Sequence, residues 1–176
     1  ILKLEDDDDD ELIGQEVMIA LNDALDKFVN MREIEGTKLV EDIERRIYII
    51  QDKVNEITNF SSTLVEEYMT RLTTRVNELL APGVVDEARL MQEIVIFSDK
   101  SSIEEELTRL KSHISQFLNL LNETNPIGKK LDFLIQEMNR ETNTIGSKAN
   151  SLEITNLVVD IKTEIENIRE QVQNIE

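Results

Sequence analysis

The apolar residues of this chain recur at alternating intervals of three and four, the spacing of one face of an α-helix. Such alternation predicts coiled-coil-like seams along which helices pack side by side. The seam positions are Ile13, Val17, Leu21, Leu25, Phe28 and Met31; Val40, Ile43, Ile47, Ile50, Val54 and Ile57; Ile103, Leu107, Leu110, Ile114, Phe117 and Leu121; and Ile154, Val158, Ile161, Ile165, Ile168, Val172 and Ile175. We therefore expect an all-α fold built from long antiparallel helical hairpins.

Interruptions of this pattern divide the chain into three parts. Residues 1–11 contain the run EDDDDDE, whose like charges repel one another, so we expect an acidic linker there that is extended or frayed. Residues 12–82 predict a long helical hairpin arm, with Gly36 tolerated inside its first helix and a turn at Asn59–Ser62. The run Ala81–Pro82–Gly83 ends the arm, and residues 83–176 form a C-terminal helical domain.

Within the C-terminal domain, two local signals indicate where helices begin and bend. Ser102 and Glu105 have the spacing of a capping box, which predicts the start of a helix. Gly146 and Ser147 permit a bend before the last helix.

Composition supports long helices and restricts the chemistry. Only 4% of residues are aromatic, and five glycines and two prolines are too few for many turns. The absence of cysteine excludes disulfides and thiolate zinc sites and fits a reducing cytoplasm. No stretch is apolar for long enough to predict a membrane span.

The net charge of −18 opposes contact with nucleic acid over most of the chain. The acidity is uneven, however, because residues 100–150 hold seven Lys and Arg against seven Asp and Glu. This region is the part of the chain that we expect to face RNA.

The polar residues between Pro126 and Lys148 exceed what helix packing requires. Glu137 and Glu141 stand one turn apart on one helix face, which is either a solvated pair or a site for a hard cation. On the preceding helix, His113 follows Arg109 by one turn. A lone helix histidine is usually structural, and since it is the only histidine, a two-histidine mechanism within one subunit is excluded.

Several segments of the chain resemble the helical C-terminal portion of the YicC/YloC family of bacterial stress-associated endoribonucleases. The match begins near Met31 and is strongest in two long C-terminal segments. The matching residues include Met31–Glu33, Glu35–Gly36, Asp99–Lys100, Arg109–Leu110, Ser112–His113, Gln116–Phe117, Lys130–Phe133, Gln136–Glu137, Asn139–Glu141, Asn143–Lys148 and Ile168–Glu176. Family members carry an α/β domain before these helices, so we expect this chain to be a fragment.

The resemblance implies an endoribonuclease that cleaves RNA phosphodiester bonds with Mn²⁺ or Mg²⁺. It also implies a homo-oligomer, a hexamer in the full-length protein, and a hairpin-containing RNA substrate in the cytoplasm. We assign catalysis to His113, Glu137, Arg140 and Glu141, and metal binding to Glu137, Glu141 and Glu170. The candidate RNA contacts are Arg32, Lys100, Arg109, Lys130, Lys148 and Arg169.

Two other functions compete with this interpretation. A non-catalytic coiled-coil assembly or adaptor module would show the same seams, with the polar groups serving only helix geometry. An acidic mimic of nucleic acid would need carboxylates at phosphate spacing, which the sequence does not display. If His113, Glu137 and Glu141 gather around one cleft, the nuclease is favoured over the adaptor.

Overall fold

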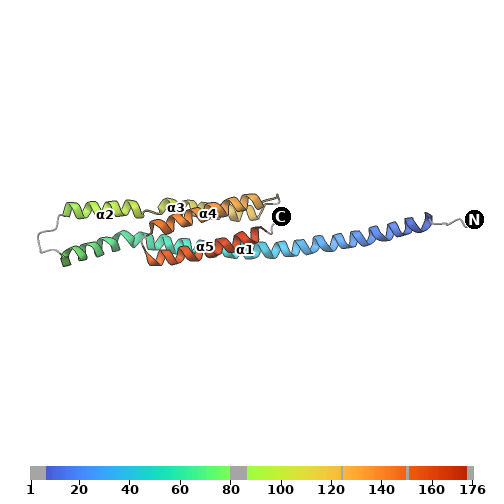
Figure 1. Ribbon diagram of the computed structural model, residues 1–176, viewed down its shortest axis with the longest axis horizontal. Helices are drawn as coiled ribbons and strands as arrows, with labels where there is room; N and C mark the ends of the chain where they lie inside the picture. Colours follow the sequence, from blue (N-terminus) through green and yellow to red (C-terminus); the bar gives the residue numbers. More distant parts are fainter. Residues whose placement is uncertain (1–6, 80–86, 124, 150, 174–176) are drawn as a thin grey trace, which may run out of the picture. The chain divides into compact units, whose positions relative to one another are not determined.

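The computed structural model describes residues 7–79, 87–123, 125–149 and 151–173, and these form five helices and no strand. The helices are α1 (Asp7–Leu79), α2 (Glu87–Ser101), α3 (Glu104–Leu121), α4 (Gly128–Lys148) and α5 (Leu152–Val172) (Figure 1). The all-α prediction is confirmed. The chain divides into two units, Ile1–Glu41 and Asp42–Glu176, and α1 contributes to both. Among the described helices, none combines the length and apolar character that a membrane span requires.

The predicted seams form the core of the larger unit. Nearly every seam position from Ile43 onward that the structure describes is almost inaccessible to solvent. Burying an isoleucine or leucine side chain stabilises the fold by about 1.5 to 3 kcal/mol, so these rows are the main source of stability. The buried seam residues are Ile43, Ile47, Ile50, Val54 and Ile57 of α1, Leu107, Leu110, Ile114, Phe117 and Leu121 of α3, and Ile154, Val158, Ile161, Ile165, Ile168 and Val172 of α5.

Polar contacts fix the direction in which the helices pack. Lys148 at the end of α4 binds Glu106 at the start of α3, with 2.7 Å between Nζ and Oε1. Lys130 at the start of α4 lies 3.0 Å from Glu123, just after α3. Helices α3 and α4 therefore run antiparallel, and Figure 1 shows α4 beside both α3 and α5.

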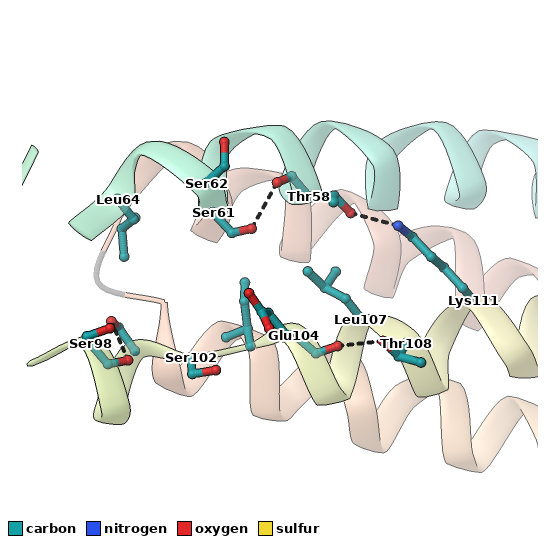
Figure 2. A pocket seen from close by; sticks show the side chains of 12 residues that line it. Thr58, Ser61, Ser62, Leu64, Ser98, Ser102, Glu104, Leu107, Thr108 and Lys111 are labelled. Carbon is teal, nitrogen blue, oxygen red and sulfur yellow. Dashed lines mark hydrogen bonds between the residues drawn. The ribbon is translucent and has the colours of Figure 1, made fainter. Parts of the chain in front are cut away.

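The turn predicted at Asn59–Ser62 is absent, since α1 continues through it to Leu79. The hydroxyl groups of this polar run bond to carbonyls of the preceding helical turn, which lets them remain helical. Thr58 donates to the carbonyl of Val54 at 2.8 Å. Ser61 donates to the carbonyl of Thr58 at 2.9 Å (Figure 2). The described part of the arm predicted at residues 12–82, residues 12–79, is thus one helix and contains no hairpin turn.

The later part of α1 instead contacts α2. The rings of Tyr68 and Phe97 stack with their centroids 3.6 Å apart. The predicted stop at Ala81–Pro82–Gly83 lies outside the described residues.

Three further local predictions were wrong. Asp7–Glu11 belongs to α1 and is not extended. The capping box does not form, because α3 begins after Ile103 and no side chain caps its first turn. The acidic residues of that turn instead interact favourably with the positive end of the helix dipole. Helix α4 passes through Gly146 without a bend, and an added Cβ there would lie 2.9 Å from Val158 of α5, so the glycine permits close packing.

In the smaller unit, Ile1–Glu41, the predicted seam is exposed. Its apolar side chains are about half accessible to solvent within this unit. The exposed seam residues are Ile13, Val17, Leu21, Leu25, Phe28 and Met31.

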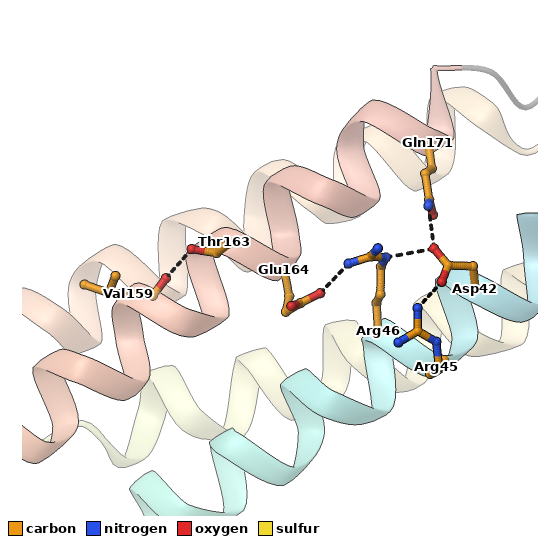
Figure 3. A network of polar contacts seen from close by, with 7 residues as sticks. All are labelled: Asp42, Arg45, Arg46, Val159, Thr163, Glu164 and Gln171. Atoms are coloured by element: carbon orange, nitrogen blue, oxygen red, sulfur yellow. Dashed lines mark hydrogen bonds and ion pairs between the residues drawn. The ribbon is translucent and has the colours of Figure 1, made fainter.

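A polar network joins α1 to α5 at one edge of the larger unit (Figure 3). Gln171 of α5 donates a hydrogen bond to Asp42. Arg46 donates to Asp42 and to Glu164, and both of these bonds are 2.8 Å long. Arg45 also binds Asp42. The hydrogen bonds from Gln171, Arg46 and Arg45 hold the pKa of Asp42 far below its usual value.

The depressed pKa of Asp42 predicts acid sensitivity of the helical unit. A carboxyl group with a lower pKa in the folded state stabilises the fold above its ordinary pKa near 4, and this contribution is lost as the pH falls. Asp42→Asn should therefore lower the free energy of unfolding at neutral pH and have a smaller effect near pH 3. Urea unfolding followed by circular dichroism measures both values, with Asp52→Asn, an exposed aspartate of the same helix, as control. An effect of Asp42→Asn that is independent of pH would contradict this account.

Candidate metal centre

Polar side chains follow the boundary between α3 and α4 in the order that antiparallel packing dictates. Lys148 binds Glu106 at one end of the row. One turn further along α3, Arg109 Nη1 lies 3.8 Å from Glu141 Oε1, and Arg109 Nη2 lies 2.6 Å from Glu105 Oε1. The stripe predicted on α3 thus faces the acidic residues predicted on α4.

His113, Glu137 and Glu141 meet at the centre of this row. Each residue offers one ligand atom, and these atoms all lie within 4.8 Å of one another. A cation bound by nitrogen and oxygen at about 2.1 Å keeps its ligand atoms about 3 to 4 Å apart, so small side-chain rotations would close the group around an ion. The gathering that favours the nuclease over the adaptor is therefore present.

Glu141 occupies a position where the seam of α4 would carry an apolar residue. It lies between Met138 and Ile145, which are buried, and is itself only 4% exposed. Its ion pair with Arg109 is long at 3.8 Å. Because a buried carboxylate is costly unless it is well paired, packing alone does not account for glutamate at this position.

Two buried polar atoms of the row have no hydrogen-bond partner within the described part of the chain. They are Nδ1 of His113 and Oε2 of Glu106. Imidazole nitrogens are common metal ligands, and buried polar atoms are normally hydrogen-bonded, so a ligand role for His113 would account for its unpaired nitrogen.

Glu106 remains an anion within this row. Burial raises the pKa of its carboxyl group, but the hydrogen bond from Lys148 and the charges of Lys148 and Arg109 outweigh burial, so the pKa lies below its usual value. Lys148 therefore neutralises Glu106, and the carboxylates nearer the centre stay available for another cation.

The donor set fits a divalent transition ion. One imidazole and two carboxylates suit Mn²⁺, which accepts both nitrogen and oxygen ligands, whereas Mg²⁺ prefers oxygen ligands and retains several waters.

The remaining predicted site residues divide by location. Arg140 is exposed and pairs with Glu137 at 3.7 Å, and Lys130 lies at the far end of the same boundary. Lys100 ends α2, while Arg169 pairs with Glu166 on α5. Glu170 is exposed on α5 and is not part of the group formed by His113, Glu137 and Glu141. Arg32 belongs to the smaller unit, where its guanidinium lies over Phe28.

A cavity of about 440 Å³ lies where α1 meets the junction of α2 and α3 (Figure 2). Its hydroxyl groups are largely used within their own helices, and Lys111 donates to Thr58 at 3.0 Å. This cavity therefore offers no reactive grouping comparable to the row between α3 and α4.

Sequence reasoning missed two features of the row. The burial of Glu141 was readable in principle, because it replaces an apolar residue between Met138 and Ile145 in the seam. The exposure of Phe133 was not readable, since aromatic residues at helical spacing are more often part of a core.

The fold and this group of residues define an all-α protein with a candidate carboxylate and imidazole metal centre. Residues 57–176 match the family model described as endoribonuclease YicC-like, C-terminal, and the chain belongs to this family. It is 52% identical to a probable endoribonuclease YicC of Clostridioides difficile, covering 100% of this chain and 61% of that protein. It is 34% identical to a probable endoribonuclease YicC of Haemophilus influenzae, covering 94% of this chain and 57% of that protein. The chain thus spans about three fifths of the length of these curated relatives.

The buried position of Glu141 predicts a conflict between stability and the site. Glu141→Leu should raise the free energy of unfolding by about 1 kcal/mol, because it removes a buried charge and completes the seam. Arg109 would keep its ion pair with Glu105 and so would not be left unpaired. Urea unfolding in the presence of a chelator measures this change, with Glu137→Leu, at a more exposed position, as the matched control. A loss of stability in Glu141→Leu would mean that the carboxylate is structural.

Proposed function

We propose that this chain carries the metal site of a divalent-metal-dependent endoribonuclease that cleaves RNA phosphodiester bonds. The observation that carries the proposal is the convergence of His113, Glu137 and Glu141 from two helices into one group. The names of the two relatives support RNA as the substrate.

Each residue of the row would have its own role in catalysis. Glu137 and Glu141 would hold the cation through their carboxylate oxygens, and His113 would complete the ligand set or exchange a proton with the reacting water. A bound divalent ion would lower the pKa of a coordinated water and stabilise charge on the phosphoryl oxygens. Arg109 and Arg140, each within 4 Å of one of these carboxylates, lie where a guanidinium could neutralise the transferring phosphate.

Contact with RNA requires positive charge beyond the metal. Lys130 and Lys148 stand at opposite ends of the row, and both are paired to glutamates that a phosphate would have to displace. We propose these lysines as backbone contacts, with Lys100, Arg169 and Arg32 as more remote ones. Such contacts would make binding strongly dependent on salt.

The proposal also includes association of this chain with other chains. The exposed seam at residues 13–31 supports association with other chains, because rows of apolar side chains are normally covered. The homo-oligomer, expected to be a hexamer in the full-length protein, stays a prediction.

Metal binding and RNA cleavage test the proposed site together. Isothermal titration with Mn²⁺ should detect a site in the unmodified chain. The double variant Glu137→Gln with Glu141→Gln should weaken binding by more than the roughly 10- to 100-fold that loss of an outer-shell partner costs. The same double substitution should abolish Mn²⁺-stimulated cleavage of a labelled hairpin RNA by a full-length protein carrying the N-terminal portion of the longer relatives.

The control for this test is Glu104→Gln, which alters an exposed carboxylate in the first turn of α3. It should leave both Mn²⁺ affinity and cleavage unchanged. Normal cleavage by the double variant, with circular dichroism showing an intact fold, would end the assignment of catalysis to this group.

A further inference from the structure

A groove of about 540 Å³ lies between α3 and α4, beyond the metal centre. Phe133 and the buried Leu134 supply apolar surface from α4, and Gln116 and Asn119 supply side-chain amides from α3. Leu120 of α3 and the lysines Lys129 and Lys130 complete the lining, and we call this feature the Phe133 groove.

Phe133 presents its ring to solvent, with 59% of the residue exposed, whereas Phe117 in the neighbouring seam is fully buried. One exposed apolar residue is ordinary on a protein surface. What distinguishes Phe133 is the combination around it, since amides and lysines line the groove and no acidic residue does. In a chain of net charge −18, a groove whose two charged lining residues are lysines favours an anionic ligand, which would compete for Lys130 with Glu123 at 3.0 Å.

The groove and the metal centre are formed by neighbouring turns of the same two helices. Phe133 precedes Glu137 by four residues on α4, and Gln116 follows His113 by three residues on α3. Residues at these spacings share one helix face, and four residues rise about 6 Å along the axis. Stacked nucleotides rise about 3.4 Å along a strand, so the ring lies within one or two nucleotide steps of the metal group.

We propose that the Phe133 groove binds an unpaired nucleobase of the RNA, one or two nucleotides from the phosphate at the metal centre. This inference rests on the proposed function and names a subsite for it. The ring provides a flat face on which any base can stack, as aromatic residues do in single-strand binding proteins. The amides of Gln116 and Asn119 can pair with base edges, and Lys129 and Lys130 can contact the flanking phosphates. The groove would thereby position unpaired RNA, such as a hairpin loop, for cleavage.

Fluorescence anisotropy of a short, unpaired, fluorescein-labelled RNA tests this subsite. A chelator prevents metal-dependent cleavage during the measurement, and low ionic strength keeps binding to the RNA phosphates strong. Phe133→Ala should weaken binding by about 5- to 150-fold, the range that loss of one base-stacking aromatic produces. Phe133→Trp should bind as well as the unmodified chain, because it retains the aromatic face. The matched control is Phe60→Ala, which removes another exposed phenylalanine, 42% accessible, from α1. It should leave binding unchanged.

Equal RNA binding by Phe133→Ala and the unmodified chain would overturn the proposal, as would failure of the unmodified chain to bind this RNA. A change in oligomeric state by sedimentation, without a change in RNA binding, would instead assign Phe133 to contact between copies of the chain. Titration of the same variants with Mn²⁺ separates this test from that of the metal site. Normal Mn²⁺ binding together with unchanged RNA affinity rejects the groove alone.

Discussion

The packing of α3 against α4 is the constraint on which the candidate site depends. The two helices are in contact, and each has a buried apolar row, Leu107, Leu110 and Ile114 on α3 and Leu131, Leu134 and Met138 on α4. In this packing, Glu141 is buried where an apolar residue would pack better, and it faces Arg109 and His113. The apolar seam thus supplies the free energy that holds an unfavourably placed carboxylate in position.

The polar residues of the larger unit form two separate groups, the network between α1 and α5 and the row between α3 and α4. The network of Asp42, Arg46 and Glu164 joins α1 to α5, and both of its carboxylates are paired with an arginine. The row between α3 and α4 contains a buried carboxylate, an unsatisfied imidazole nitrogen and partly exposed arginines. Buried polar atoms are normally hydrogen-bonded, so the unpaired nitrogen of His113 supports its proposed role as a ligand. The neighbouring groove adds an aromatic surface to the same boundary, so ion binding and base binding would share one pair of helices.

The helices and their buried faces could be predicted because apolar spacing reports directly on packing, as at Ile43 to Ile57 and Ile154 to Val172. Helical spacing placed Glu137 and Glu141 on one face and His113 one turn from Arg109 on the preceding helix, which indicated that the three groups could meet but not that they do. The turn at Asn59–Ser62 was mispredicted because serine hydroxyls can either stabilise a turn or bond to carbonyls of the preceding helical turn. Ser61 and Ser62 do the second, and the sequence does not say which occurs. Glu170 did not join the group, since similarity to a family motif carries no information about where a side chain lies in space.

The central claim is that His113, Glu137 and Glu141 together hold a divalent cation. Crystals of the chain soaked in Mn²⁺, with diffraction recorded at the manganese absorption edge, test it most directly. The account predicts an anomalous peak within about 2.3 Å of ligand atoms from all three residues. Clear density for the three side chains with no peak between them, at a Mn²⁺ concentration that saturates binding in solution, would contradict it.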